Sequence, residues 1–307
     1  MPTETPSTTS FIAITGASGL IGRALLARLR LKGKRVRPLV RSPRPDSPDD
    51  IVWDPMAEKL APRDLEGVEA VVHLAGEPIA QRWTGSRREA IRESRVRGTK
   101  LLARTIAALD QKPRVLLSGS AVGYYGDRGD EAVDETSAPG TDFLAGVAHE
   151  WEMATAAASD AGVRVVLLRT GIVLSPHGGA LERLLPPFRL GVGGPIGTGR
   201  QWMSWIALED HLRAMEHALA TTGLHGPANL VAPNPVTNAE FAATLGRVLG
   251  RPAIVTVPSF ALELLYGEMA RATILAGQRV MPKALLRSGF HFAHPTLEEA
   301  LRVELAR

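Results

Sequence analysis

Glycines at a regular spacing near the start of the chain could bind a phosphate group. They lie in the string Ile14-Thr15-Gly16-Ala17-Ser18-Gly19-Leu20-Ile21-Gly22, between a short apolar run and a stretch with helical periodicity. Gly16 would permit a tight turn, Gly19 would let the backbone approach a pyrophosphate, and Gly22 would let the helix pack closely on the strand. Free N–H groups at the helix start would then face the anion. We predict that Gly16–Gly22 is a dinucleotide-binding loop; the alternative is a glycine-rich turn that binds nothing.

The end of the second predicted strand bears on which dinucleotide would bind. An acidic side chain there accepts a hydrogen bond from a ribose 2′-hydroxyl, whereas an arginine accommodates a 2′-phosphate. Here Val40 is followed by Arg41 and Ser42, and no acidic residue comes before Asp46. A guanidinium binds phosphate through paired hydrogen bonds. The sequence therefore favours NADP over NAD, unless Arg41 is a plain surface arginine.

The elements that must position this loop alternate between strand and helix. Apolar runs predict strands at 11–15, 34–41, 51–54, 70–74, 114–118 and 163–169, and helical spacing predicts helices at 20–32, 86–109 and 142–161. This alternation indicates βαβ units and a parallel sheet. The uniformly apolar runs 71–74 and 163–168 fit strands covered on both faces. We therefore predict an α/β protein with a doubly wound, Rossmann-type parallel sheet.

The alternation breaks after Thr170. Residues 178–199 are dense in glycine and proline and are predicted as loop, and Asn238 is a plausible N-cap for a helix over 239–249. We expect a disordered tail at 1–10 and an NADP-binding Rossmann domain at 11–175, joined by strands and helices from the later chain. A smaller C-terminal substrate lobe would occupy 176–307.

Composition excludes several classes of protein. The 307 residues include no cysteine, which excludes disulfides, thiolate metal sites and cysteine catalysis and fits a reducing cytoplasm. The net charge of +4 comes from scattered basic residues without an aromatic platform, so we expect no nucleic-acid partner. No apolar run reaches bilayer length, and no histidine pair has metal-ligand spacing near an acidic residue. The expected partner is a small-molecule substrate, and the expected state is a monomer or homodimer.

Several further strings support a family resemblance. They are His73-Leu74-Ala75-Gly76, Arg95-Val96-Arg97-Gly98-Thr99, Ser118-Gly119-Ser120-Ala121 with Tyr124-Tyr125-Gly126, Leu168-Arg169-Thr170-Gly171, and Trp205-Ile206 with Asp210. With the glycine loop, they resemble the extended short-chain dehydrogenase/reductase superfamily over about residues 11–305, although Arg95 stands where the superfamily has asparagine. The resemblance implies that the cofactor lies along these residues: Leu74, Ala75, Gly76, Ser118, Arg169 and Gly171.

A narrower branch is also similar. The strings that match it are Gly123-Tyr124-Tyr125-Gly126-Asp127, Asp142-Phe143-Leu144, Trp151-Glu152, Gln278-Arg279-Val280-Met281-Pro282 and Gly289-Phe290. They resemble bacterial "epimerase-family" proteins, which are similar to nucleoside-diphosphate-sugar epimerases and carry a short dedicated C-terminal domain. That domain would cover about residues 255–305.

The catalytic residues of the superfamily are only partly present. There, a tyrosine acts as general acid/base, a lysine four residues later lowers its pKa, and a serine orients it. Ser120 matches the serine, but Phe143 and Val147 stand at the tyrosine and lysine positions, and neither can transfer a proton. Tyr124 or Tyr125 could replace the tyrosine, or both could only pack at the cleft wall.

The resemblance leaves two functions open. The first is an NADP-dependent oxidoreductase or epimerase acting on a small carbonyl compound or a nucleotide sugar, with Ser120 polarising the substrate oxygen. Gln201, Trp202 and Trp205 would line its substrate cleft, since indole rings can stack on a sugar-like ligand, unless they pack in the core. The second is a non-catalytic NADP-binding or sensing protein, which the missing tyrosine and lysine favour.

Overall fold

A parallel sheet forms the centre of the structure, a computed structural model that describes residues 10–45 and 47–306. The sheet has seven strands, and every neighbouring pair is parallel. In order across the sheet the strands are β11 (Gly226–Leu230), β7 (Arg164–Thr170), β5 (Val115–Ala121), β4 (Val68–His73), β1 (Phe11–Thr15), β2 (Val36–Val40) and β3 (Ile51–Val52). The predicted Rossmann-type α/β fold is confirmed.

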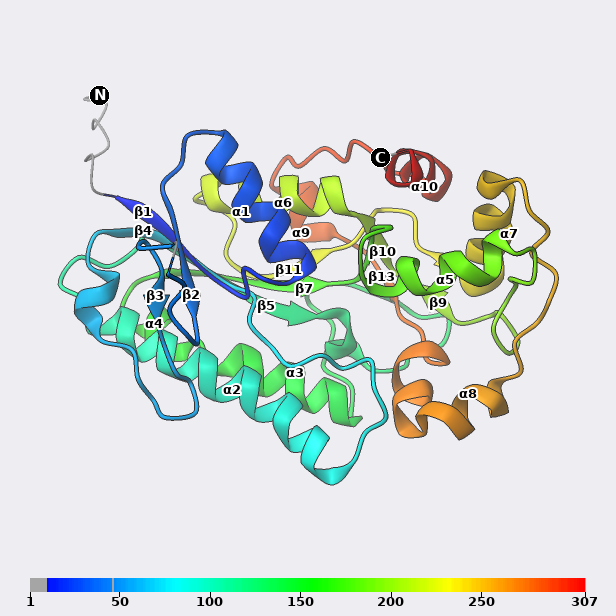
Figure 1. The fold of residues 1–307 in the computed structure, drawn as a ribbon, viewed down its shortest axis with the longest axis horizontal. Helices are drawn as coiled ribbons and strands as arrows, with labels where there is room; N and C mark the ends of the chain where they lie inside the picture. The colour runs from blue at the N-terminus through cyan, green and yellow to red at the C-terminus, as the bar shows by residue number, and fades with distance from the viewer. Residues whose placement is uncertain (1–9, 46, 307) are drawn as a thin grey trace.

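Helices cover both faces of this sheet (Figure 1). One face carries α1 (Leu20–Leu31) and α6 (Leu208–Ala220), and the other carries α2 (Gly85–Ala107), α3 (Phe143–Met153) and α4 (Ala156–Asp160). Successive strand residues point to opposite faces, so Ile12 and Ile14 enter one buried core while Phe11 and Ala13 enter the other. Burial on both faces explains why the strands are apolar throughout.

The later chain builds a smaller lobe around its own core. Strand β8 (Ile172–Leu174) pairs with β10 (Trp205–Ala207), and the core includes Trp205 and Phe241. The lobe's main helices are α5 (Gly179–Arg189), α7 (Asn238–Leu249) and α10 (Leu297–Leu305). Along the whole chain, the remaining short elements are η1 (Pro62–Leu65), η2 (Val122–Tyr125), β6 (Ala132–Val133), β9 (Trp202–Met203), β12 (Val236–Thr237), α8 (Ser259–Tyr266), η3 (Ala270–Ile274), β13 (Arg279–Val280) and α9 (Lys283–Arg287).

Two of the expected elements differ from the structure. The stretch 178–199, expected as loop, contains α5, which buries Leu181, Leu185 and Phe188 on one face despite its prolines. The expected helix 142–161 is interrupted after Met153 and continues as α4. At this break the Thr155 hydroxyl donates to the Glu152 carbonyl at 2.7 Å, a local bond that competes with regular helix geometry.

The N-cap of α7 is also shifted from its expected residue. Thr237, not Asn238, caps the helix, and it forms a capping box with Glu240. Asn238 instead accepts a hydrogen bond from the Ile196 backbone at 2.7 Å. It therefore fixes the loop before β9 rather than the helix start.

Three further expectations concern the N-terminal tail, membrane-spanning helices and metal sites. The expected tail at 1–10 lies, apart from Ser10, outside the described residues. Within the described ranges, none of the helices combines the length and apolarity needed to cross a membrane. The same ranges hold no cluster of three or more acidic or histidine side chains suited to a metal ion.

Candidate cofactor cleft and active site

A cleft of about 430 Å³ opens at the carboxyl ends of the central strands. In open parallel sheets this edge is where ligands bind. The glycine loop lines one side, and residues at the carboxyl ends of β5 and β7 line the other. The lining residues include Gly16, Gly19, Leu20, Ile21, Gly22, Leu74, Gly119, Ser120, Trp151, Thr170 and Gly171. Ser120, predicted for catalysis, therefore shares one cleft with the glycine loop predicted for cofactor binding.

Close packing makes glycine necessary at two positions of the loop. Gly16 has a φ of +68°, and a Cβ there would lie 2.8 Å from the Leu74 carbonyl carbon. A Cβ on Gly22 would lie 2.2 Å from the Gly16 oxygen. The N-cap of α1 is Gly19, so no side chain satisfies the first N–H groups of the helix. Ala17 and Ser18 lie between these glycines, and Ser18 is exposed. This geometry suits a bound anion such as a pyrophosphate.

A buried hydrogen-bond chain that sequence reasoning missed holds the turn opposite the loop. Thr15 Oγ1 accepts from the backbone N–H groups of Leu74 at 3.0 Å and Ala75 at 3.1 Å. Its own hydrogen is then free to be donated to His73 Nδ1 at 2.7 Å, and His73 Nε2 donates to Thr99 Oγ1 at 2.9 Å. Burial lowers the pKa of His73 to about 4, so the ring is neutral, as this chain of bonds requires.

Arg41 follows directly after β2 and is exposed. No residue in the described parts of the chain forms a hydrogen bond or ion pair with its side chain. By contrast, Arg44 is held by two hydrogen bonds of 2.6 Å to Asp50. The guanidinium of Arg41, with exposed Ser42 beside it, is therefore available to a ligand.

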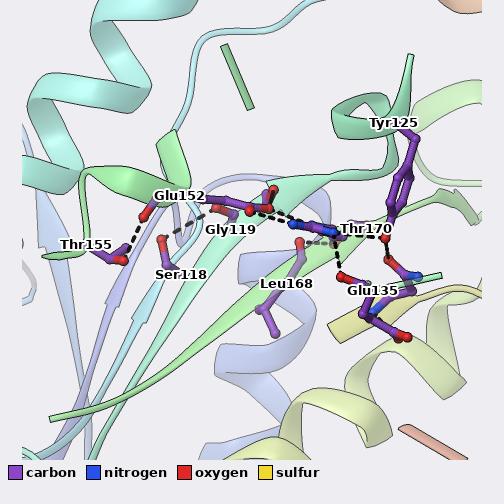
Figure 2. Close-up of polar contacts among 11 residues, drawn as sticks. Ser118, Gly119, Tyr125, Glu135, Glu152, Thr155, Leu168 and Thr170 are labelled. Atoms are coloured by element: carbon purple, nitrogen blue, oxygen red, sulfur yellow. Dashed lines mark hydrogen bonds and ion pairs between the residues drawn. The ribbon is translucent and has the colours of Figure 1, made fainter. Parts of the chain in front are cut away.

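Ser120 is the polar side chain that connects the cleft to a buried ion pair. Figure 2 labels the carboxylate of this pair, Glu152. Its hydroxyl donates to Glu152 Oε1 at 2.6 Å. Arg169 binds the same carboxylate through two hydrogen bonds of 2.8 Å: its Nε donates to Oε1 and its Nη2 donates to Oε2. Burial works against the charge of Arg169, but the hydrogen bonds and charge of Glu152 outweigh it and raise the pKa of Arg169 above its ordinary value. Glu152 therefore lies beneath Ser120 as a paired carboxylate.

The two tyrosines proposed as catalytic lie outside the cleft lining. Tyr125 is fully buried; its hydroxyl donates to Asn229 Oδ1 at 2.7 Å and accepts from Arg169 at 3.0 Å. Burial raises the pKa of Tyr125 to about 12, which keeps the phenol neutral. The ring of Tyr124 packs against the Arg169 guanidinium, 3.5 Å from ring centroid to Cζ. These contacts favour the packing alternative for both tyrosines.

Carbon side chains fill the tyrosine and lysine positions of α3. Phe143 packs edge-on against Trp83, with 5.2 Å between ring centroids, and lies 4.3 Å below the Arg88 guanidinium. Val147 is buried. Neither of these two side chains can transfer a proton, as the sequence indicated.

The other predicted site residues differ in whether their side chains are buried or exposed to a ligand. Arg169 is occupied by Glu152, and Ser118 is buried within β5, so neither side chain faces the cleft. Trp205 is fully buried and donates to the Asn234 carbonyl at 3.1 Å, so it is a core residue with no surface to offer a substrate. Gln201 and Trp202 stay half-buried near the lobe surface, where Trp202 donates to Asp130 at 2.8 Å.

Comparison with known proteins shows which family this chain belongs to. The profile of the NAD dependent epimerase/dehydratase family matches residues 12–231. The chain belongs to this family. A second profile, a domain of unknown function (DUF1731), matches residues 257–303 and falls within the C-terminal segment expected at about 255–305.

Relatives in this family share nearly the whole chain. The epimerase family protein Mb2239 of Mycobacterium bovis is 47% identical over 291 residues, which cover 94% of this chain and 96% of that protein. A crystal structure of human epimerase family protein SDR39U1 with NADPH has a TM-score of 0.89 and 35% identity, covering 96% of this chain and 99% of that one. The nucleoside-diphosphate sugar epimerase of Corynebacterium glutamicum has a TM-score of 0.79 and 41% identity, covering 98% and 59%.

Proposed function

We propose that this family member binds NADP and acts as an oxidoreductase or epimerase on a small carbonyl compound or a nucleotide sugar. The observation that carries the proposal is that Ser120 and the glycine loop line the same cleft. The human relative crystallised with NADPH supports the choice of cofactor. Arg41, which is exposed and pairs with none of the described residues, supports it as well, because an arginine accommodates a 2′-phosphate.

The residues present fit a dinucleotide. The uncapped N–H groups at the start of α1 would hold the pyrophosphate, and the close glycine packing at Gly16 and Gly22 leaves backbone rather than side chains at its surface. Arg41 would bind the 2′-phosphate. When bound, the nicotinamide supplies hydride exchange with the substrate carbon.

The proton would be handled by Ser120 and Glu152. In the resting arrangement Ser120 donates its hydrogen to Glu152, which leaves the lone pairs of Oγ free to accept from a substrate hydroxyl. As that hydroxyl loses its proton to Ser120 Oγ, the serine proton moves to Glu152; reduction of a carbonyl runs the same path in reverse. Ser120 is then the residue that touches substrate, and Glu152 acts through it.

A second candidate function is cofactor binding without turnover. The packing of Phe143 and Val147 favours it, because the face of α3 that carries the acid/base in the superfamily holds only carbon here. Such a protein would bind NADP and transmit its occupancy to a partner.

Consumption of NADPH with a panel of carbonyl compounds and nucleotide sugars separates the two candidates. Turnover that is lost in Ser120→Ala and kept in Ser159→Ala, an exposed serine on α4, supports the enzyme. Turnover that survives Ser120→Ala removes Ser120 from the mechanism. Saturable NADPH binding without turnover on any member of the panel supports the non-catalytic candidate.

A further inference from the structure

Large apolar side chains are exposed together at the end of the smaller lobe. The described parts of the chain hold twelve exposed large hydrophobic residues, and seven of them fall in the stretches 190–192 and 254–265. These seven are Leu190, Val192, Ile254, Val255, Phe260, Leu264 and Leu265. Soluble monomers rarely expose a large contiguous apolar patch, so such a patch indicates a surface that another molecule covers.

The stretches that carry these side chains are neighbours in space. The backbone N–H of Val255 donates to the Gly193 carbonyl at 3.2 Å, and that of Val257 donates to the Pro195 carbonyl at 2.9 Å. Residues 252–257, which we call the edge segment, therefore run parallel to the chain that follows α5. Figure 1 shows the two running together at the right of the molecule, down to α8.

Helix α8 continues the apolar surface directly after the edge segment. None of its residues is buried, although most of its side chains are apolar. Phe260 and Leu264 are four residues apart and so lie on one face, and they are 71% and 78% exposed. The helix carries one charged residue, Glu263. A surface helix that turns its apolar face outward is missing the element against which this face would pack.

The outer side of the edge segment has backbone groups without partners. Successive residues of an extended chain direct their N–H and C=O groups to opposite sides. Val255 and Val257 direct theirs toward the chain after α5, so Ile254 and Thr256 direct theirs outward. No residue within 10–45 or 47–306 forms a hydrogen bond with these outward groups. An apolar strand edge in this state is a template for pairing with another chain.

An identical edge in antiparallel orientation satisfies these groups. With a two-fold axis at Val255, Ile254 lies opposite the partner's Thr256, and the two residues exchange N–H···O bonds. Val255 then faces the partner's Val255, with Cβ atoms about 4.5–5.5 Å apart. The same arrangement brings Arg251, which is exposed and pairs with none of the described residues, toward the partner's α8 and its single charge, that of a glutamate.

The exposed apolar area matches what a stable dimer needs. A standard interface buries about 800 Å² on each partner, a little more than half of it nonpolar. The seven side chains are between 46% and 81% exposed. At roughly 60–120 Å² for a fully exposed side chain, they present on the order of 400 Å² of apolar surface.

We propose that two copies of this chain associate through their edge segments, paired antiparallel about Val255, with the apolar faces of α8 covered in the same interface. The pairing does not depend on the cofactor, because the edge segment and α8 contribute no residue to the lining of the cofactor cleft.

Sedimentation equilibrium tests the association. We expect the wild type to form a dimer, and we expect Ile254→Lys to raise the dimer dissociation constant roughly 100-fold or more, because it places an unpaired charge in the interface. Leu264→Lys on α8 should act in the same direction. Leu31→Lys is the matched control, since Leu31 is 90% exposed on α1, away from the edge segment.

An engineered cross-link tests the register. The chain has no cysteine, so Val255→Cys introduces a single thiol. Mild oxidation should join two copies of this variant, because the expected spacing is close to that of a disulfide. The control, Leu31→Cys, should stay unlinked.

The outcomes bear on this proposal alone. A wild type that stays monomeric at micromolar concentrations overturns it. A dimer that persists in both Ile254→Lys and Leu264→Lys, or that forms without cross-linking at Val255→Cys, associates through another surface and overturns it as well. NADPH binding by the dissociated variants would leave the proposed function untouched.

Discussion

The hydroxyl of Ser120 lies 2.6 Å from the carboxylate of Glu152, a residue 32 positions later, and donates its hydrogen to it. Glu152 is in turn held on both oxygens by Arg169. A hydroxyl at the cleft is thereby linked to a buried ion pair. The link gives the site a polar path through Glu152, although Phe143 and Val147 earlier on the same helix cannot transfer a proton.

Removing the charge of Glu152 should strongly destabilise the protein. Glu152→Gln keeps the side-chain shape but leaves the Arg169 guanidinium buried without a counter-charge, which costs about 3–5 kcal/mol. The matched control is Glu150→Gln on the same helix, whose pair with Arg92 is solvent-exposed and contributes at most about 1 kcal/mol. Urea denaturation measures both. Equal losses of unfolding free energy would contradict a special role for the buried pair.

Gly22→Ala should disrupt the dinucleotide loop. The new Cβ would lie 2.2 Å from the Gly16 oxygen, so the loop must shift, at a cost of about 1–3 kcal/mol. We also expect a clear loss of NADPH affinity. Gly146→Ala is the control, because a methyl group there would have no atom outside its own helix within 4 Å, and alanine should stabilise α3 by up to about 1 kcal/mol. Thermal melting and a binding titration check the pair; unchanged binding in Gly22→Ala would argue against the loop assignment.

Stability should fall as the pH drops from about 6.5 to about 4. Burial lowers the pKa of His73 and of His211 to about 4, whereas an unfolded histidine titrates near 6.5. In this window the unfolded state binds more protons, so the stability present above pH 6.5 is lost on acidification, by at most about 1.4 kcal/mol per pH unit for each histidine.

His211→Leu isolates one of these two contributions. The imidazole contacts Thr170 through Nε2 at 3.2 Å, and its buried Nδ1 has no partner in the described chain. Urea denaturation at pH 7, 6, 5 and 4.5 measures the unfolding free energy of both proteins. This free energy should fall less steeply with decreasing pH in the variant, because unfolding then takes up close to one proton fewer. An identical decline in both proteins would mean that His211 is not buried in its neutral form.

Local patterns in the sequence were sufficient to predict the sheet and the glycine turn between β1 and α1. The alternation of strand and helix and the spacing of Gly16, Gly19 and Gly22 depend on near neighbours in the chain. The stretch containing α5 was predicted as loop because residues 178–199 are dense in glycine and proline, although Leu181, Leu185 and Phe188 share one face. Amphipathic spacing was the available signal, and it outweighs the prolines because they fall in the last turns.

The centre of the site was harder to predict because its contacts are distant in sequence. Glu152 meets Ser120 and Arg169 from another element, and no local pattern distinguishes it from exposed Glu150 two residues earlier. The same holds for Trp205, whose burial depends on packing across the smaller lobe. Only the resemblance drew attention to the Trp151-Glu152 string, and it did so without assigning either residue a role.

A calorimetric titration of the wild type and Arg41→Ala with NADPH and NADH tests the central claim most directly. We predict saturable binding of NADPH by the wild type. Arg41→Ala should weaken NADPH by about 1.5–3 kcal/mol, the worth of a charged phosphate contact, and leave NADH nearly unaffected. Equal weakening of both would count against the role of Arg41, and no saturable binding of either cofactor would contradict the account as a whole.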